Sequence, residues 1–265
     1  MNRCNICVDP NCGGKQDCNC ETCSRRETCY RVLSPTIRVT LKCTQSCSHC
    51  CFSCSPKKDV HMTPDTAREI NQFLIANNIQ YINIMGGEVF CNPQWQEVFS
   101  NLIENIPAVR YVTNGDWAIN PDEMILFLSN HPQVVTCISK DQWHNNKHVD
   151  LADNLLTEAG ILHKVATDDQ TKEESIVPVG NAQYEYNLYS SFSYYCGKPD
   201  RMYSFLIDEV GNISKCSFGA WVYDDIHNFL DGGFDVRFKY FTGLFYQQFI
   251  PNCSTCIRCS ERSKE

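Results

Sequence analysis

The sequence lacks long apolar runs and any concentration of basic residues. No stretch approaches the about 20 consecutive apolar residues of a membrane-spanning helix, and its first residues, MNRCNICVDP, lack the apolar centre of a secretory signal peptide. Its 23 basic residues are scattered, and 31 acidic residues give a net charge of −8. Because nucleic-acid binding needs a positive field, we expect neither a membrane nor a nucleic-acid partner.

Cysteine, by contrast, is abundant, at 19 residues. Such a count indicates either a secreted disulfide scaffold or intracellular metal sites. The odd number, the C-x2-C pairs and the missing signal peptide favour metal ligands in a reducing, cytoplasmic compartment. Seven cysteines lie between Cys4 and Cys29, five between Cys43 and Cys54, and five between Cys196 and Cys259, which predicts several separate sites.

Short apolar, β-branched runs alternate with helical patterns from Thr36 to about Ala182. Helix starts are marked by Thr63-Pro64, Asn92-Pro93 and Asn120-Pro121, and a helix over 149–159 is ended by Gly160. This alternation predicts an α/β fold with a parallel sheet and right-handed crossovers. The predicted strands cover residues 36–43, 81–88, 108–115, 134–141, 160–169 and 174–182.

The carboxyl ends of these strands carry unusual residues, and ligands of parallel sheets bind at such ends. We therefore expect one mouth to gather Cys43 and the segments 86–88, 113–115, 139–141 and 178–180.

The pattern changes after Gln183. The stretch RMYSFLIDEVGNISKCSF indicates two strands about a Gly211-Asn212 turn, and an aromatic-rich, helical segment over 234–249 leads into CSTCIRC. These features predict a small cysteine-rich α+β module. The expected organisation is a metal-binding segment over 1–35, the α/β domain over 36–183, and the module over 184–265.

The stretch KCTQSCSHCCFSCSP, residues 42–56, spaces Cys43, Cys47 and Cys50 as C-x3-C-x2-C. A cubane iron–sulfur cluster normally takes four thiolates, so three leave one iron open to an outside ligand. An open metal position is a chemical one, whereas a closed one is structural. Cys51 or Cys54 as a fourth ligand is the alternative.

With GGE at the next strand end, this loop resembles the radical SAM superfamily. The resemblance extends through YVTNG, CISKDQWH and VPVGNA, and so covers about residues 36–182. It implies a partial (β/α)6 TIM-like barrel in which Cys43, Cys47 and Cys50 hold a 4Fe–4S cluster. The open iron would be chelated by the amino and carboxylate groups of S-adenosylmethionine.

The resemblance also implies cofactor contacts. His49 would lie near the adenine, Glu88 would face the methionyl ammonium, and Ser139, with Asp141, would contact the ribose or carboxylate unless both are plain strand-end caps. Gly86 and Gly87 would let the chain approach the ligand closely. Val179 and Gly180 would border the adenine, and Asn114, the asparagine of TNG, would be a further cofactor contact.

Other residues near the mouth have simpler interpretations. His144 is expected to be structural. Cys91 and Cys137 are expected to be small buried apolar residues, with a hydrogen-atom donor as the alternative for Cys91.

The chemistry implied is the cofactor's own. One electron from the reduced cluster cleaves the sulfonium to methionine and a 5′-deoxyadenosyl radical, which takes a hydrogen atom from the substrate. The protein must supply a dry, closed mouth. A donor such as flavodoxin or ferredoxin would deliver the electron.

The C-terminal pattern C-x14-G-x4-C, followed by C-x2-C-x2-C, resembles the Twitch or SPASM modules that hold an auxiliary 4Fe–4S cluster. The expected ligands are Cys196, Cys216, Cys253 and Cys256, with Cys259 spare or an alternative, and zinc is the competing metal. At the N-terminus a second pattern, C-x2-C-x12-C-x2-C, predicts zinc or a third cluster, held by Cys4, Cys7, Cys20 and Cys23.

Relatives with such modules act on peptides or on small polar molecules. The leading hypothesis is an enzyme that crosslinks or oxidises a peptide, as maturases of ribosomally made peptides do. The alternatives are a small-molecule radical SAM dehydrogenase and, in another class, a non-catalytic iron–sulfur electron carrier.

Overall fold

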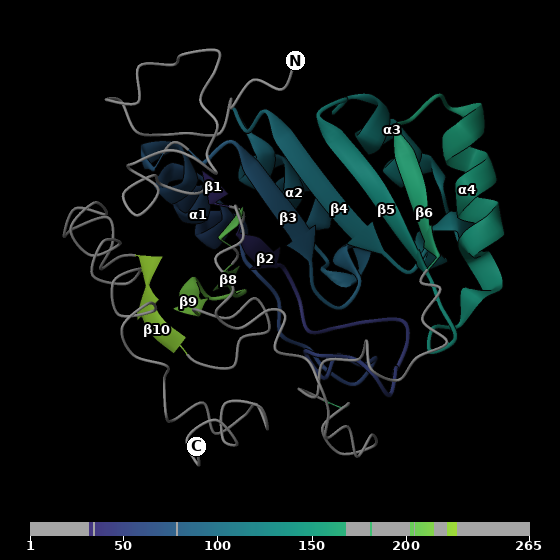
Figure 1. The fold of residues 1–265 in the computed structure, drawn as a ribbon, viewed down its shortest axis with the longest axis horizontal. Coiled ribbons are helices and arrows are strands. Elements are labelled where there is room, and N and C mark those ends of the chain that lie inside the picture. Colours follow the sequence, from purple (N-terminus) through teal and green to yellow (C-terminus); the bar gives the residue numbers. More distant parts are fainter. Residues whose placement is uncertain are drawn as a thin grey trace, which may run out of the picture.

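The computed structural model of the chain describes residues 32–33, 35–77, 79–167, 181, 202–203, 205–214 and 222–226. Within them, the main sheet has the strand order β10-β9-β8-β2-β3-β4-β5-β6 (Figure 1). A two-stranded parallel sheet pairs β1 (Val32–Leu33) with β7 (Met202–Tyr203). The strands of the main sheet are β2 (Thr36–Arg38), β3 (Tyr81–Met85), β4 (Ala108–Thr113), β5 (Val134–Lys140), β6 (His163–Thr167), β8 (Leu206–Ile207), β9 (Asn212–Ser214) and β10 (Val222–Asp225).

Strands β2 to β6 are parallel and follow chain order, so each pairs with the next across a crossover. The register aligns Ile37 with Ile84, Ile84 with Tyr111, and Tyr111 with Thr136. This arrangement confirms the predicted α/β class and five of the predicted strands. The sixth, over 174–182, lies outside the described residues except for Asn181.

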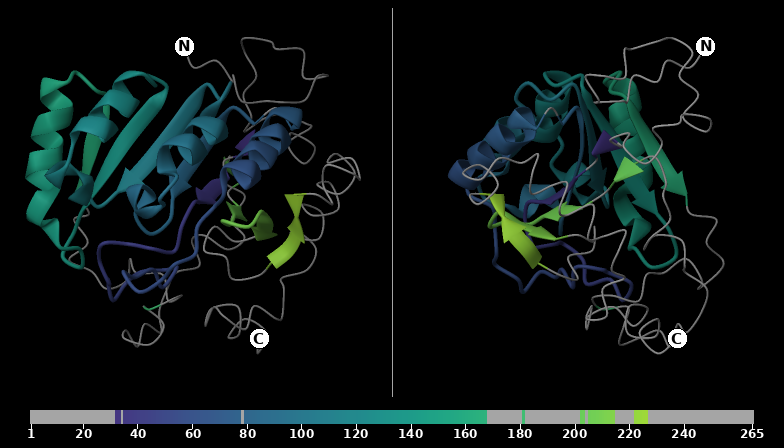
Figure 2. Two further views of the ribbon diagram at one scale, coloured as in Figure 1. Left: turned by 180° about the vertical axis from the view of Figure 1, so that it is seen from behind. Right: turned by 60° about the vertical axis from the view of Figure 1, so that its left-hand side comes forward.

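The helices cover one face of this sheet. They are α1 (Pro64–Ala76), α2 (Trp95–Ile103), α3 (Asp122–Ser129) and α4 (Val149–Glu158), with short 3-10 turns η1 (Val89–Cys91), η2 (Asp116–Ile119) and η3 (Asn146–His148). Helices α2 and α3 lie behind the sheet in Figure 1 and in front of it in the rear view of Figure 2. No described helix is long and apolar enough to cross a membrane.

The predicted helix starts are confirmed with small shifts. Thr63 caps α1, because its hydroxyl accepts the backbone N–H of Thr66 at 3.1 Å. Helix α2 begins two residues after Pro93, because the Asn92 side chain accepts the Gln94 N–H at 2.9 Å and forms a separate turn first. Helix α3 begins at Asp122, one residue after Pro121, and Gly160, with φ +67°, follows the end of α4.

The core lies between the helices and the inward side chains of the parallel strands. Ile37, Ile84 and Tyr111 are fully buried beneath Phe73 of α1 and Phe99 of α2. The rings of Phe99 and Tyr111 meet edge to face, with centroids 5.4 Å apart. Since burying each such side chain contributes about 1.5–3 kcal/mol, this layer fixes the strand ends that carry the site.

The C-terminal hairpin extends the same sheet. Strands β8 and β9 are antiparallel, and β8 pairs in parallel with β2. The turn between them covers residues 208–211 and uses Gly211 at φ +87°, slightly before the predicted Gly211-Asn212 position, because Asn212 already belongs to β9. The boundary at 183/184 stays a prediction, and the predicted segment 234–249 lies outside the described residues.

Candidate functional site

The cysteine loop, residues 43–54, follows β2 and lies beyond the carboxyl ends of the neighbouring strands. In Figure 1 the arrowheads of β3, β4 and β5 point toward it. Its two ends are held together, because the Cys43 N–H donates to the Ser55 carbonyl at 3.2 Å and the Ser55 N–H donates to the Leu41 carbonyl at 3.3 Å. The loop therefore leaves the sheet and returns to it at the predicted mouth, with its two ends hydrogen-bonded to each other.

Each thiol of the C-x3-C-x2-C pattern is half-buried and has polar neighbours. The Asn114 amide lies 3.7 Å from the Cys43 sulfur, the Cys47 thiol lies 3.6 Å from the Gln45 side-chain oxygen, and the Cys54 N–H donates to the Cys50 sulfur at 3.3 Å.

The acidities of these thiols differ. Burial raises the pKa of Cys43 and of Cys47 to about 12. A hydrogen bond from the Cys54 thiol outweighs burial at Cys50 and lowers its pKa to about 6. The same bond, with burial, raises the pKa of Cys54 well above its usual range. Cys50 is thus the thiol of the three that ionises most readily.

The two glycines after β3 pack against the chain itself. A β-carbon at Gly87 would lie 1.8 Å from the Lys42 carbonyl oxygen, and one at Gly86 would lie 2.7 Å from the Thr40 carbonyl oxygen. The Gly87 N–H donates to Thr40 and the Glu88 N–H to Lys42, both at 2.8 Å. Glycine is therefore needed here to seat the end of β3 against the start of the cysteine loop, whereas close approach to a ligand stays a prediction.

Glu88 forms the centre of a buried group, the Glu88 cluster, made of Glu88, Tyr111, Thr113 and Asn114. Its carboxylate is 0% exposed and accepts from the Tyr111 hydroxyl at 2.7 Å, the Thr113 hydroxyl at 2.9 Å, and the N–H groups of Asn114 at 2.9 Å and Val89 at 3.1 Å. A carboxylate offers about four acceptor positions, so the protein alone fills them. Burial nevertheless raises the pKa of Glu88 to about 7. The predicted ammonium contact stays a prediction and would require one of these bonds to be shared.

A polar network then connects the Glu88 cluster to the cysteine loop. The Asn114 side chain donates to the Thr44 hydroxyl at 3.0 Å, and Thr44 donates to the buried Asp116 carboxylate at 2.5 Å. The Gln45 side chain donates to Asp116 and to the Asn145 carbonyl, both at 3.1 Å, and accepts the Asn145 N–H at 2.9 Å. Gln45 thereby fastens the loop to the segments after both β4 and β5.

The sequence analysis missed this network because its partners are 70 to 100 residues apart along the chain. For Tyr111 and Thr113 a signal existed. They alternate along β4 and so share one face of that strand, and the pairing of Tyr111 with Ile84 sets them near the end of β3.

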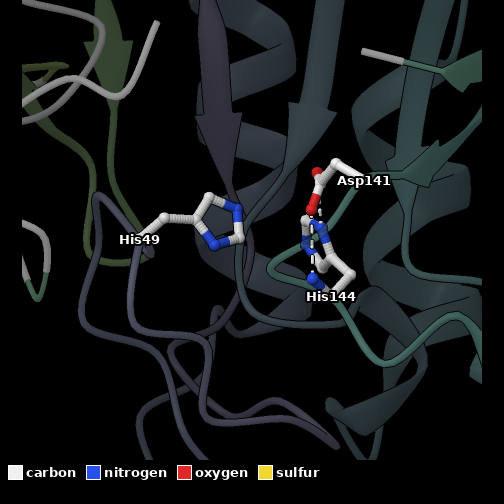
Figure 3. A group of neighbouring side chains, drawn as sticks. All are labelled: His49, Asp141 and His144. Carbon is white, nitrogen blue, oxygen red and sulfur yellow. Dashed lines mark hydrogen bonds and ion pairs between the residues drawn. The ribbon is translucent and has the colours of Figure 1, made fainter. Parts of the chain in front are cut away.

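A second group, the His49 group, consists of His49, Asp141 and His144 (Figure 3). Asp141 accepts the backbone N–H groups of Trp143 and His144 at 2.9 and 3.0 Å, and its other oxygen meets the His144 ring at 2.7 Å. His49, from the cysteine loop, faces His144 with ring centroids 4.6 Å apart, but its buried Nδ1 has no hydrogen-bond partner in the described part of the chain.

Burial favours a neutral His49 ring. Burial, reinforced by the neighbouring His144, lowers the pKa of His49 to about 4. Burial opposes ionisation of Asp141, but the His144 hydrogen bond and charge outweigh it and hold the pKa of Asp141 at about 2. A neutral imidazole with a vacant hydrogen-bonding position suits an uncharged polar ligand.

The His49 group also has the residue types of a metal site, because one potential ligand atom from each member lies within 4.8 Å of the others. Two of its members, however, are already paired with each other. The Asp141 side-chain oxygens make three hydrogen bonds, two of them with the backbone N–H and the ring of His144, so Asp141 is a cap that orients His144. The interpretation of Asp141 as a strand-end cap therefore has direct geometric support.

The other predicted residues lie as follows. Ser139, at the end of β5, is half-buried, Cys91 is half-buried in η1, and Cys137 is 1% exposed beside the Arg110 guanidinium. Asn181, which the sequence analysis did not assign to the site, binds the cysteine loop, because its N–H donates to the Cys50 carbonyl and its side chain to the Cys47 carbonyl, both at 2.9 Å.

The predicted N-terminal and C-terminal metal ligands and two of the adenine contacts lie outside the described residues. They are Cys4, Cys7, Cys20, Cys23, Cys196, Cys216, Cys253, Cys256, Cys259, Val179 and Gly180.

The chemistry of the described residues fits an iron–sulfur cluster with a nucleoside ligand. Three thiols share one loop, and backbone and thiol donors lie at the sulfur of Cys50, as suits thiolates that ligate iron. On the side of His49, a buried ring nitrogen lacks the partner that a buried polar atom normally has.

Comparisons with known proteins agree with this geometry. Residues 37–148 match the radical SAM superfamily. The chain is 27% identical over 120 residues to the putative peptide biosynthesis protein YydG of Bacillus subtilis (strain 168), a match that covers 43% of this chain and 38% of YydG. It is 23% identical over 116 residues to the antilisterial bacteriocin subtilosin biosynthesis protein AlbA of the same strain, covering 44% of this chain and 26% of AlbA.

The fold has solved counterparts as well. The structure of BtrN in complex with AdoMet and 2-DOIA superposes with a TM-score of 0.57 at 14% identity, covering 81% of this chain and 87% of BtrN. This likeness confirms the predicted partial-barrel fold. The chain spans well under half the length of the two curated relatives. Residues 37–148 of this chain therefore form a radical SAM domain, a family that implies a 4Fe–4S cluster and S-adenosylmethionine.

Proposed function

We propose that this chain is a radical SAM enzyme that modifies a peptide, by forming a crosslink or by oxidising a residue. The observation that carries the proposal is the loop that brings three thiols to the carboxyl ends of β3 to β5, inside a radical SAM domain. Two relatives named for peptide or bacteriocin biosynthesis support the peptide substrate. A small-molecule substrate and an electron-carrier role remain the alternatives to be tested.

In this proposal Cys43, Cys47 and Cys50 hold the 4Fe–4S cluster, and S-adenosylmethionine binds beside it. Together they supply one-electron cleavage of the sulfonium and the abstraction of a hydrogen atom from the substrate. No described side chain is assigned to the abstraction itself.

The chain's own residues prepare the place for this chemistry. The Glu88 cluster holds Asn114 in position, and Asn114 in turn contacts the Cys43 sulfur and Thr44. Gln45 fixes the loop to the segments after β4 and β5. The Nδ1 of His49, which has no partner among the described residues, would hydrogen-bond the nucleoside. Such preorganisation suits a reaction in which a radical must be kept from side reactions.

An auxiliary 4Fe–4S cluster at Cys196, Cys216, Cys253 and Cys256 is part of the proposal, as is zinc or a third cluster at the N-terminal cysteines. Cys253→Ala should leave S-adenosylmethionine cleavage intact and stop substrate turnover. Normal turnover by that variant would contradict the auxiliary role. The electron donor, such as flavodoxin or ferredoxin, and the reducing cytoplasmic setting also stay predictions.

The first test needs no substrate. The anaerobic, iron-loaded protein is reduced with dithionite and given S-adenosylmethionine, and 5′-deoxyadenosine is measured by chromatography. We expect the product from the parent protein and from Cys137→Ala, which removes a buried thiol of β5, but none from Cys50→Ala. No product from a parent protein with a full cluster would favour the electron carrier.

The second test concerns the substrate. A short peptide encoded next to this gene is incubated with the reduced protein and S-adenosylmethionine, and its mass and deuterium uptake are followed. We expect a loss of hydrogen from the peptide. A peptide that is unchanged, while a small metabolite is consumed, would favour the dehydrogenase alternative.

A further inference from the structure

Cys54 is a buried thiol directly beneath the predicted cluster ligands. It is 2% exposed and packs with Phe52 and Leu206 in an apolar layer that also includes Leu41, Cys43, Cys50, Cys51 and Met85. A buried cysteine can serve simply as a small apolar residue, so evidence for a further role must come from the contacts of this thiol.

Both hydrogen-bond donors of Cys54, its backbone N–H and its thiol, contact the sulfur of Cys50. The Cys54 backbone N–H donates to it at 3.3 Å, and the Cys54 thiol is hydrogen-bonded to it as well. The backbone is shaped for this contact, because Ser53 has φ +53° and donates its N–H to the Cys50 carbonyl at 3.2 Å. The turn thereby brings residue 54 back onto residue 50.

The sulfur atoms of Cys43 and Cys47 have different hydrogen-bond surroundings in the described structure. The Cys43 sulfur has the Asn114 amide at 3.7 Å, a longer contact, and a backbone hydrogen bond from Gln45, so its two donors come from two different residues. The Cys47 thiol is itself the donor, toward Gln45 at 3.6 Å, and that bond ends once Cys47 loses its proton to ligate a metal. Cys50 is thus the sulfur that a single buried residue approaches with two donors.

Resting on the proposed function, we propose that Cys54 is a positioning residue that hydrogen-bonds the iron-bound thiolate of Cys50 and raises the reduction potential of the cluster. A reduced cluster carries one more negative charge than an oxidised one, and part of that charge lies on the ligand sulfur. Hydrogen-bond donors at that sulfur therefore stabilise the reduced state more, and such bonds are among the factors that set cluster potentials. Since burial strengthens the interaction, Cys54 makes the first electron easier to accept without becoming a ligand.

The test is a redox titration of the full-length, iron-loaded protein, followed by electron paramagnetic resonance. Dithionite supplies one electron to each cluster, and the signal that changes when S-adenosylmethionine is added identifies the cluster of the cysteine loop. The variants are Cys54→Ala, which removes the donor, and Cys54→Ser, which keeps a hydroxyl donor. Cys137→Ala serves as the matched loss of a buried thiol elsewhere.

We expect a more negative midpoint potential for Cys54→Ala than for the parent, with Cys54→Ser between them and Cys137→Ala unchanged. Midpoints of both Cys54 variants that equal the parent's would overturn the proposal. Loss of the cluster signal in both variants, with iron content falling, would overturn it too, because Cys54 would then be a fourth ligand. A parent protein whose signals ignore S-adenosylmethionine would refute the proposed function itself, which is a different outcome.

Discussion

The Glu88 cluster and the His49 group lie at the same mouth but differ in how completely the protein satisfies them. The Glu88 carboxylate is fully buried and accepts four hydrogen bonds from its own chain. The His49 ring is half-buried, and its Nδ1 lacks a partner among the described residues. The first group is complete without a ligand, whereas we propose that a ligand completes the second.

We infer from this difference that the Glu88 cluster belongs to the structural scaffold and that His49 belongs to the ligand-binding surface. An unsatisfied buried polar group costs about 1–3 kcal/mol, so a site retains one where a ligand will pair with it. A residue of the Glu88 cluster should therefore affect stability when changed, and His49 should affect ligand binding. The variants below test this division.

The largest effect is expected for Glu88→Gln. An amide accepts at one oxygen only and turns its own N–H groups toward the donors around it, so we expect the free energy of unfolding to fall by about 1–3 kcal/mol. Urea denaturation of the cluster-free chain measures this. The control, Glu97→Gln on the exposed face of α2, should change it by less than about 0.5 kcal/mol. Equal effects of the two variants would show that the Glu88 hydrogen bonds are not structural.

The pH dependence of the same variant sharpens this test. The pKa of Glu88 is raised from 4.5 to about 7, so between these values the folded chain binds more protons than the unfolded chain. The parent therefore loses stability as the pH rises from 4.5 through 7, and Glu88→Gln does not titrate there. We expect the difference in unfolding free energy between parent and variant to shrink from about pH 5 to about pH 8. A constant difference would mean that Glu88 ionises normally.

Gln45→Glu tests the connection between the cysteine loop and the strand ends. The new carboxylate retains the bond from the Asn145 N–H, but it loses both donated bonds and repels Asp116. We expect a destabilisation of about 1–2 kcal/mol and less iron per chain after reconstitution. Gln96→Glu, on the exposed side of α2, is the matched control. If Gln45→Glu binds as much iron as the parent and is equally stable, then Gln45 does not position the cysteine loop.

The smallest change in stability is expected for His49→Ala, at less than about 0.5 kcal/mol. Its affinity for S-adenosylmethionine should fall severalfold, because the variant lacks the vacant nitrogen of the ring. Equilibrium binding to the oxidised, cluster-loaded protein measures this. A large loss of stability with unchanged affinity would reverse the proposed division between the two groups.

Local patterns predicted most of the described fold. Short apolar, β-branched runs marked β2 to β6, and Thr63 marked the start of α1 because its cap involves residues only three positions apart. The start of α2 was misplaced because the Asn92 side chain forms a turn of its own, and from sequence alone a turn and a first helical turn look alike.

The site was predicted as a set of positions but not as a set of contacts. The alternation of the sheet brings Cys43, Glu88 and Asn114 to one edge, and the structure places all three there. The contacts that define their roles depend on the exact sheet register and on loop paths. Glu88 reaches Asn114 across 26 residues, and Gln45 reaches Asn145 across 100. The contact of Gly87 with Lys42 also depends on register, which short-range patterns do not encode.

The most direct measurement uses S-adenosylmethionine isotopically labelled at its amino nitrogen. The cluster-loaded protein is reduced, given the labelled compound, and examined by electron–nuclear double resonance. If Cys43, Cys47 and Cys50 hold the cluster as proposed and leave one iron open, the amino group binds that iron directly, and we expect a strong coupling to the labelled nucleus. The absence of any coupling, in protein whose loop cluster is intact and reduced, would contradict the account.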